Sequence, residues 1–368
     1  MTDLEHAVGL RETFQRLRKA LAGLGLVGRA AQLAVGTTPH REIFRENKTR
    51  LLRYDLGAAP STLPPLVMVP SLINRHYIFD LMPRKSIVEF FACRGVAAYS
   101  VDWGAPSDED RYLSLERYVA SYLHRAVRAA CRDSGQDRVV LVGYCLGGSL
   151  AAAYAALHPE RVQAFVALTT PIDFTDNGLL GTWSRSASFD LEALIEATGN
   201  VPWALLQSSF TLLRPTLSVS KARGILEKFW DNEFLDGVLA LETWGNDNVS
   251  FAGQCYRQVI ETLYRDNALV RGTLHLGGRL VDLRRITCPV LNVQASFDNI
   301  VPLAASHALV EQVGSDDVTE WTVPGGHIGA VVSKKAMAQV WPAVLEWLGA
   351  HAYARPADDG ASTHTPGR

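Results

Sequence analysis

Hydrophobic positions along the chain repeat with two different periods, and these periods predict its secondary structure. Between residues 50 and 171, short apolar runs alternate with stretches in which apolar residues recur every three or four positions. The short runs predict buried strands and the longer stretches predict helices. We expect strands at 51–56, 65–72, 96–103, 139–144 and 162–171, and helices at 87–95, 115–135 and 146–158. This alternation favours an α/β fold with a mostly parallel sheet covered by helices on both faces.

The alternation is interrupted after residue 171. Residues 172–285 contain few strand patterns, and their helical patterns lie at 191–199, 222–244 and 256–270. Beyond residue 285, strands are expected at 289–297 and 318–324, and helices at 304–313 and 334–352. We therefore predict one α/β core formed by 41–171 and 286–354, with a helical cap or lid, 172–285, inserted into it.

The two ends of the chain differ from this core. In the segment 1–40, Leu10, Phe14, Leu17, Leu21 and Leu24 form an apolar stripe that predicts a helix. Such a stripe can pack on the protein's own body, or it can face a partner subunit or a hydrophobic surface. The tail 355–368 is rich in Pro, Gly and Ser and is expected to be disordered.

Composition and charge exclude several classes of protein. Hydrophobic residues make up 48% of the 368, which is enough for a packed core and argues against wholesale disorder. The net charge of −2 removes the simple electrostatic case for binding nucleic acid or an anionic membrane. The five cysteines include no CxxC pair, so neither a disulfide framework nor a zinc site is expected, and free thiols fit a reducing cytosol. Charges near the N-terminus argue against a signal peptide.

One uncharged run, Val139–Leu157, is long enough to resemble a membrane-spanning helix. Its first part is β-branched and its middle reads GYCLGG (143–148). A buried strand, a tight turn and a helix of small residues explain the same run, so we expect no transmembrane segment.

The GYCLGG turn matches the G-x-C-x-G form of the nucleophile elbow, in which a strand delivers a nucleophile to a sharp turn before a helix. Cys145 is the candidate nucleophile. The helix that follows directs free N–H groups at the sulfur and favours the thiolate, and the Leu146 N–H is a candidate oxyanion donor. The competing interpretation is a buried, inert cysteine in a turn of small residues.

Asp298 and His327 follow Cys145 in the chain order that this fold uses, nucleophile, acid, histidine. Each lies just beyond a predicted strand, so the three side chains are expected to meet at one edge of the sheet. A second oxyanion donor is expected from the loop after the strand at 65–72, with the Leu72 or Ile73 N–H as candidates. A cysteine nucleophile forms a thioester, which suits acyl transfer from a thioester to a hydroxyl.

These residues belong to a longer resemblance, from about Phe44 to Leu348. The chain resembles the catalytic subunit of polyhydroxyalkanoate synthases, and specifically the short class III, two-component type. The resemblance rests on FRENKTRLLRY (44–54), INRHYIFDL (73–81), YSVDWGAPSDEDRYLSLERYV (99–119), GYCLGGS (143–149), ALHPERV (156–162), TTPIDF (169–174), ETWGNDNVSFAGQCYRQ (242–258), GGRLVDL (277–283) and GGHIG (325–329). The segment with Trp244, Asp247 and Arg257 is similar to that of the short type.

The resemblance implies an α/β-hydrolase fold and an acyltransferase that polymerises (R)-3-hydroxyacyl-CoA into polyester and releases CoA. It assigns Cys145 as the nucleophile that carries the chain and His327 as the general base. Asp298 either orients His327 or activates the substrate's 3-hydroxyl. It further implies a second synthase subunit, a homodimer or hetero-oligomer, and a cytoplasmic location on the surface of polyhydroxyalkanoate granules. No metal or other cofactor is expected, since the CoA thioester is the substrate.

Three alternatives remain open. A Cys-dependent α/β-hydrolase or acyl-CoA thioesterase would use the same site and release free acid. A granule-surface or scaffold protein would carry a decayed site, against which the intact order of Cys145, Asp298 and His327 argues. A peripheral membrane module would depend on the N-terminal stripe alone.

Overall fold

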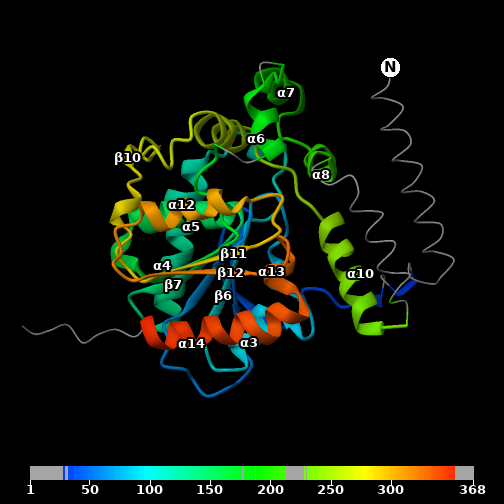
Figure 1. The fold of residues 1–368 in the computed structure, drawn as a ribbon, viewed down its shortest axis with the longest axis vertical. Coiled ribbons are helices and arrows are strands. Elements are labelled where there is room, and N and C mark those ends of the chain that lie inside the picture. Colours follow the sequence, from blue (N-terminus) through cyan, green and yellow to red (C-terminus); the bar gives the residue numbers. More distant parts are fainter. Residues whose placement is uncertain are drawn as a thin grey trace, which may run out of the picture.

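Eight strands lie side by side in one twisted sheet, and this sheet is the centre of the molecule (Figure 1). The computed structural model describes residues 28–29, 32–175, 178–186, 188–212, 228 and 230–352. In spatial order the strands are β1 (His40–Glu46), β2 (Thr49–Tyr54), β6 (Ala98–Asp102), β3 (Leu66–Val69), β7 (Val139–Tyr144), β8 (Val162–Leu168), β11 (Val290–Ala295) and β12 (Val318–Val323). The pairs β1–β2 and β2–β6 are antiparallel, and all the other neighbours are parallel.

Helices cover both faces of this sheet because successive side chains of its strands point to opposite sides. Leu66 and Met68 belong to the core cluster under α3 and α14, whereas Val67 and Val69 belong to the cluster under α4, α5 and α12. The helices are α3 (Ile87–Ala92), α4 (His124–Ser134), α5 (Leu146–Leu157), α12 (Leu303–Gln312), α13 (Gly329–Val332) and α14 (Trp341–His351). Two π-helical turns, η3 (Arg117–Leu123) and η7 (Ala336–Val340), lead into α4 and α14. Every residue of β7 is buried, so this strand lies in the middle of the core.

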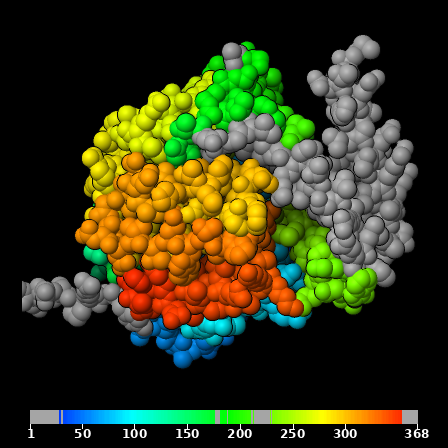
Figure 2. All heavy atoms as spheres, in the orientation of Figure 1, coloured from blue at the N-terminus to red at the C-terminus, as the bar shows by residue number. Residues whose placement is uncertain are grey.

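The chain between β8 and β11 is mainly helical and lies over one end of this core, in green and yellow (Figures 1 and 2). It contains α6 (Gly178–Arg185), α7 (Leu191–Thr198), α8 (Trp203–Leu212), α10 (Asn232–Asn246), α11 (Gly253–Gln258) and the π-helical η5 (Val259–Arg265). A hairpin of β9 (His275–Leu276) and β10 (Arg279–Leu280) and a short turn, η6 (Leu283–Arg285), lead back to the core. We call residues 172–285 the cap.

The remaining elements are short. They are η1 (His76–Phe79), the hairpin of β4 (Asp80–Met82) and β5 (Lys85–Ser86), η2 (Asp108–Tyr112) and η4 (Pro159–Arg161). The first of these, η1, follows the loop after β3 and therefore bears on the site described below.

The α/β fold predicted from the hydrophobic pattern is confirmed. The uncharged run Val139–Leu157 is divided into β7 and α5 by Cys145. No helix in the described part of the chain is long and apolar enough to cross a membrane. The pattern missed β1 because this edge strand is largely exposed and its only apolar residues, Ile43 and Phe44, are adjacent and do not alternate with polar ones. The apolar stripe at 10–24 and the tail 355–368 lie outside the described residues, as do 222–227 of the helix expected at 222–244.

Candidate active site

Cys145 occupies a sharp turn between the end of β7 and the start of α5. Its backbone has φ 56° and ψ −135°, a conformation that residues other than glycine seldom adopt. Two backbone hydrogen bonds hold the turn, because the Cys145 N–H donates to the Leu168 carbonyl at 3.0 Å and the Gly148 N–H donates to the Cys145 carbonyl at 2.8 Å. This geometry is that of a nucleophile elbow, in which the side chain projects from the turn at the carboxyl edge of the sheet.

Two glycines allow α5 to approach the sheet closely behind this turn. A Cβ on Gly148 would lie 1.9 Å from the Thr170 hydroxyl oxygen, and a Cβ on Gly147 would lie 2.3 Å from the Val69 carbonyl oxygen. Both distances are far shorter than any van der Waals contact. The small residues of the motif are therefore required by the packing of α5 against the ends of β3 and β8.

Asp298 and His327 lie in the loops that follow β11 and β12, and they form a hydrogen-bonded pair. The His327 Nδ1 is 2.7 Å from Asp298 Oδ2, and the two side chains are only 8% and 1% exposed. The other carboxylate oxygen, Oδ1, accepts the N–H groups of Ile300 at 2.8 Å and Val301 at 2.9 Å. Both oxygens of Asp298 are thus used within the protein, and the carboxylate fixes the orientation of the imidazole.

The imidazole of His327 also contacts Cys145. Burial by itself lowers the pKa of His327, but the charge of the Cys145 sulfur, the Asp298 carboxylate and a hydrogen bond with that sulfur raise it to about 10. The imidazole therefore carries a positive charge at neutral pH, and the N-terminus of α5 adds a second positive field beside the sulfur. The ring of Tyr144 lies against the imidazole with centroids 5.1 Å apart and limits its movement.

A cavity of about 140 Å³ lies over Cys145 between the core and the cap. The core lines it with Ile73, Cys145, Leu146, Pro171, Ile300 and Val301, and the cap with Trp183, Ser184, Phe189, Leu206, Ser209, Phe251, Tyr256, Val259, Ile260 and Tyr264. Most of this wall is apolar, so the cavity suits an acyl chain better than a charged group. A larger cavity of about 400 Å³ lies beside β12 and is lined by none of the three candidate catalytic residues.

The candidate oxyanion donors differ in their positions. Leu146 begins α5, so its N–H lacks an acceptor within the helix, and the residue lines the cavity over Cys145. Ile73 also lines this cavity, whereas Leu72 is buried in the core and does not. The Ile73 N–H has only a long contact of 3.5 Å with the Ser71 hydroxyl oxygen. Leu146 and Ile73 are therefore the candidates placed to face a bound substrate.

The sequence pattern did not single out Tyr144 or the aromatic wall of the cap as parts of the site. Tyr256 lies in a motif quoted above, but no spacing shows which side of a cap helix faces Cys145. That depends on how the cap folds over the core. Among the described residues, no group of three or more His, Cys, Asp or Glu side chains is arranged to hold a metal ion.

Comparisons with known proteins identify the fold and a group of relatives. The model of the alpha/beta hydrolase fold matches residues 64–331, and that of the poly-beta-hydroxybutyrate polymerase N-terminus matches residues 26–91. The poly(3-hydroxyalkanoate) polymerase subunit PhaC of Allochromatium vinosum is 37% identical over 342 residues, which are 92% of this chain and 96% of that protein. The subunit of the same name from Synechocystis sp. is 35% identical over 349 residues, 92% of each chain.

Solved structures agree on the fold. A thermophilic esterase from Thermogutta terrifontis superimposes with a TM-score of 0.52 at 15% identity and covers 85% of this chain and 98% of its own. At this level of identity the likeness concerns the fold alone.

Proposed function

The chain belongs to the family of poly(3-hydroxyalkanoate) polymerases, and from that membership we propose that it polymerises (R)-3-hydroxyacyl-CoA into polyester with release of CoA. It is an acyltransferase. The observation that supports the site most directly is the cysteine at the nucleophile elbow, hydrogen-bonded to the buried pair of His327 and Asp298 beneath an apolar cavity.

The first half of the proposed reaction transfers the acyl group to the enzyme. The Cys145 thiolate attacks the thioester carbonyl of the acyl-CoA, and the negative charge that develops on its oxygen is stabilised by the Leu146 and Ile73 N–H groups. The bond to the CoA sulfur then breaks. CoA leaves as the thiol by taking the proton of the His327 imidazolium, and the acyl group stays on Cys145 as a thioester.

The second half extends the chain. Neutral His327 accepts the proton of the 3-hydroxyl of another acyl unit, whose oxygen attacks the thioester on Cys145. An ester forms and the Cys145 thiolate leaves, so the extended chain is now the acyl group of the second unit's CoA thioester, and the imidazolium is regenerated. A repeat of the first half returns this chain to Cys145 and releases that CoA as the thiol. Asp298 orients His327 in this scheme. Both its oxygens are already bonded within the protein and its side chain is 1% exposed, which supports orientation over direct contact with the substrate hydroxyl.

Water competes with the hydroxyl for the thioester, and hydrolysis would end the chain. The apolar residues that the cap places over Cys145, among them Leu206, Val259 and Ile260, support a site that excludes water. This supports polymerisation over the thioesterase alternative, which requires water at the thioester in every turnover.

The partner and the location are parts of the same proposal. The Allochromatium vinosum and Synechocystis relatives are named as subunits, which supports a second synthase subunit and an assembly as a homodimer or hetero-oligomer. A cytoplasmic location on the surface of polyhydroxyalkanoate granules follows from the family resemblance. We further propose that no cofactor beyond the CoA thioester is used.

The experiment that tests this function follows CoA release from (R)-3-hydroxybutyryl-CoA by the purified chain and analyses the acyl product by mass. We expect polyester in an amount that matches the released CoA, and faster release when a candidate second subunit is added. Free 3-hydroxybutyrate in place of polyester would favour the thioesterase. No CoA release with or without the second subunit would contradict the proposed substrate.

A further inference from the structure

The loop after β3 carries Ile73 into the cavity over Cys145, and its next residues extend away from that cavity. Asn74 and Arg75 connect Ile73 to η1, which begins at His76. The Ile73 N–H itself has only the long contact with Ser71. The position of this N–H therefore depends on what holds the residues that follow it.

The cap holds this loop from one side, through the C-terminal end of α10. The Trp244 indole N–H donates to the Arg75 carbonyl at 2.9 Å. The Asp247 carboxylate accepts the Arg75 Nε at 3.2 Å and the Tyr77 hydroxyl at 2.9 Å. The Asn74 side chain donates to Asn248 at 2.5 Å. Asn74 and Arg75 of the loop and Tyr77 of η1 are thus bonded to the segment 244–248.

The same cap segment continues to a second cap helix. The Asn248 amide donates to Gln207 of α8 at 2.6 Å and to the Gly245 carbonyl at 2.8 Å. Leu206, the neighbour of Gln207, lines the cavity over Cys145. A displacement of α8 or of the end of α10 would therefore be transmitted to the loop through Asn248 and Asp247.

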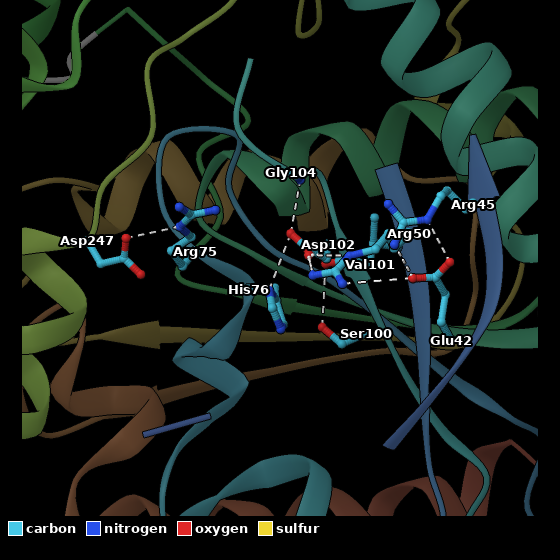
Figure 3. Close-up of polar contacts among 10 residues, drawn as sticks. All are labelled: Glu42, Arg45, Arg50, Arg75, His76, Ser100, Val101, Asp102, Gly104 and Asp247. Carbon is cyan, nitrogen blue, oxygen red and sulfur yellow. Dashed lines mark hydrogen bonds and ion pairs between the residues drawn. The ribbon is translucent and has the colours of Figure 1, made fainter. Parts of the chain in front are cut away.

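The core holds the loop from the other side. Figure 3 shows Arg75 and His76 reaching in opposite directions, the first to Asp247 and the second to Asp102 at the end of β6. The His76 Nδ1 is 3.4 Å from Asp102 Oδ1, and Asp102 also bonds Arg50 and the Gly104 N–H. Burial opposes ionisation of Asp102, but contact with His76, the Gly104 N–H and Arg50 holds its pKa well below the usual range. The anchor on the core is thus a buried carboxylate that stays charged.

We propose that Asp247 and Arg75 are positioning residues that tie the cap to this loop and so hold the Ile73 N–H where the oxyanion develops. The inference rests on the proposed function and on Ile73 as an oxyanion donor. The His76 ring lies beside the Asp102 carboxylate on the core side of the loop, and the Asp247–Arg75 contact adjusts the loop to the position of the cap. The oxyanion site is then complete only when the end of α10 is in contact with the loop.

Loss of the Arg75–Asp247 ion pair should disturb the position of the loop more than the stability of the fold. The Arg75 and Asp247 side chains are 31% and 47% exposed, and an ion pair this accessible contributes little to the free energy of unfolding. The chain offers a matched pair elsewhere in the cap. Arg257 of α11 and Glu192 of α7 are 2.7 Å apart with side chains 29% and 55% exposed, and within the described part of the chain neither is hydrogen-bonded to the loop.

The test compares Asp247→Ala with Glu192→Ala in CoA release from (R)-3-hydroxybutyryl-CoA. We expect kcat to fall about tenfold or more in Asp247→Ala, since a small misplacement of a catalytic group is costly, while KM changes by less than about twofold. Asp247→Asn, whose amide oxygen still accepts hydrogen bonds, should recover most of kcat. Glu192→Ala should resemble the wild type, and all three variants should unfold near the wild-type temperature.

A second measurement, alkylation of Cys145, shows whether Asp247→Ala affects the oxyanion site without affecting the nucleophile. The rate at which iodoacetamide alkylates Cys145 needs the thiolate but no oxyanion donor, so it should be the same in Asp247→Ala and in the wild type. Equal kcat values for Asp247→Ala and Glu192→Ala would overturn the proposal, and so would a parallel loss of alkylation, which would show a general disturbance of the site. If the wild type releases no CoA while Cys145 is alkylated normally, the proposed function fails first and this inference with it.

Discussion

At the scale of single residues, the proposed reaction depends on Cys145 and on the groups that surround its sulfur. The elbow places this thiol at the N-terminus of α5 and beside the imidazole of His327. The other thiols have different surroundings, since burial raises the pKa of Cys288 to about 12. A thiol of that kind is unreactive at neutral pH.

Replacement of Cys145 by alanine should therefore remove activity. We expect CoA release by Cys145→Ala to fall by at least about 10³-fold, since loss of a nucleophile removes the covalent route. Cys288→Ala is the control and should keep nearly all activity, because its thiol has no part in the site. Substantial polymer from Cys145→Ala would refute the assignment of the nucleophile.

The raised pKa of His327 predicts the pH range over which its imidazole keeps a proton. A histidine whose pKa is about 10 in the folded protein stays charged through the neutral range and loses its proton only as the pH approaches that value. The NMR resonances of the His327 ring should therefore stay constant through the neutral range, where an ordinary histidine titrates with a pKa of about 6.5. A midpoint of the His327 titration near that ordinary value would contradict the prediction.

His327→Gln removes this positive charge. We expect iodoacetamide to alkylate Cys145 more slowly in this variant than in the wild type at neutral pH, because the thiol has lost its cationic neighbour. The rate is measured over the whole pH range in both proteins. Identical profiles would mean that His327 does not maintain the thiolate.

The residues of the site were predictable to different degrees. Cys145, Asp298 and His327 follow strands, and parallel strands bring their carboxyl ends to one edge, so order and placement were enough to nominate them. The cavity wall was not predictable, because Trp183 and Tyr264 reach Cys145 only through the fold of the cap. The bond between Asp247 and Arg75 likewise joins segments that lie far apart in the chain.

At the scale of elements, the elbow formed by β7, Cys145 and α5 brings this helix very close to the ends of β3 and β8. β7 and α5 have nearly the bounds expected from the apolar run, because a long run without charged residues is expected to be buried. Elements outside such runs were missed. β1 is exposed at the sheet edge, and the hairpins β4–β5 and β9–β10 have strands of only two or three residues.

Gly148→Ala tests the closeness of this packing. The new Cβ would lie 1.9 Å from the Thr170 hydroxyl oxygen, so α5 or the end of β8 must move. We expect the free energy of unfolding to fall by about 1–3 kcal/mol, the usual cost of overpacking, with a loss of kcat as Cys145 is displaced. The measurement is chemical denaturation together with CoA release.

Gly349→Ala is the matched control for this substitution. Gly349 lies in α14, and a Cβ there would have no heavy atom within 4 Å. The variant should gain about 0.5–1 kcal/mol, because alanine loses less conformational freedom in a helix. Equal effects of the two substitutions would contradict the close approach of α5 to β8.

At the scale of the whole molecule, we propose that the cap determines which acceptor reaches the thioester on Cys145. The core alone provides Cys145, Asp298 and His327, as in a hydrolase of the same fold. The cap adds most of the apolar wall above them. Polymerisation in preference to hydrolysis is therefore a property of the two parts together.

Val259→Thr tests this role of the cap. Val259 is buried in the cavity wall, and threonine of nearly equal volume adds one hydroxyl that can hold water near Cys145. We expect a larger fraction of the acyl groups to appear as free acid instead of polyester. Val344→Thr, buried in α14 away from the cavity, should have a similar cost in stability and an unchanged product ratio.

The most direct test of the central claim is the mass of the acyl group on Cys145 during turnover. The enzyme is mixed with (R)-3-hydroxybutyryl-CoA, quenched within the first turnovers, digested, and its peptides are mapped by mass spectrometry. We expect a series of masses, or ladder, that corresponds to one, two and more hydroxybutyryl units on the peptide that contains Cys145. The corresponding peptide of Cys145→Ala should be unmodified. A ladder on another residue, or a single unit that is released without ever being extended, would contradict it.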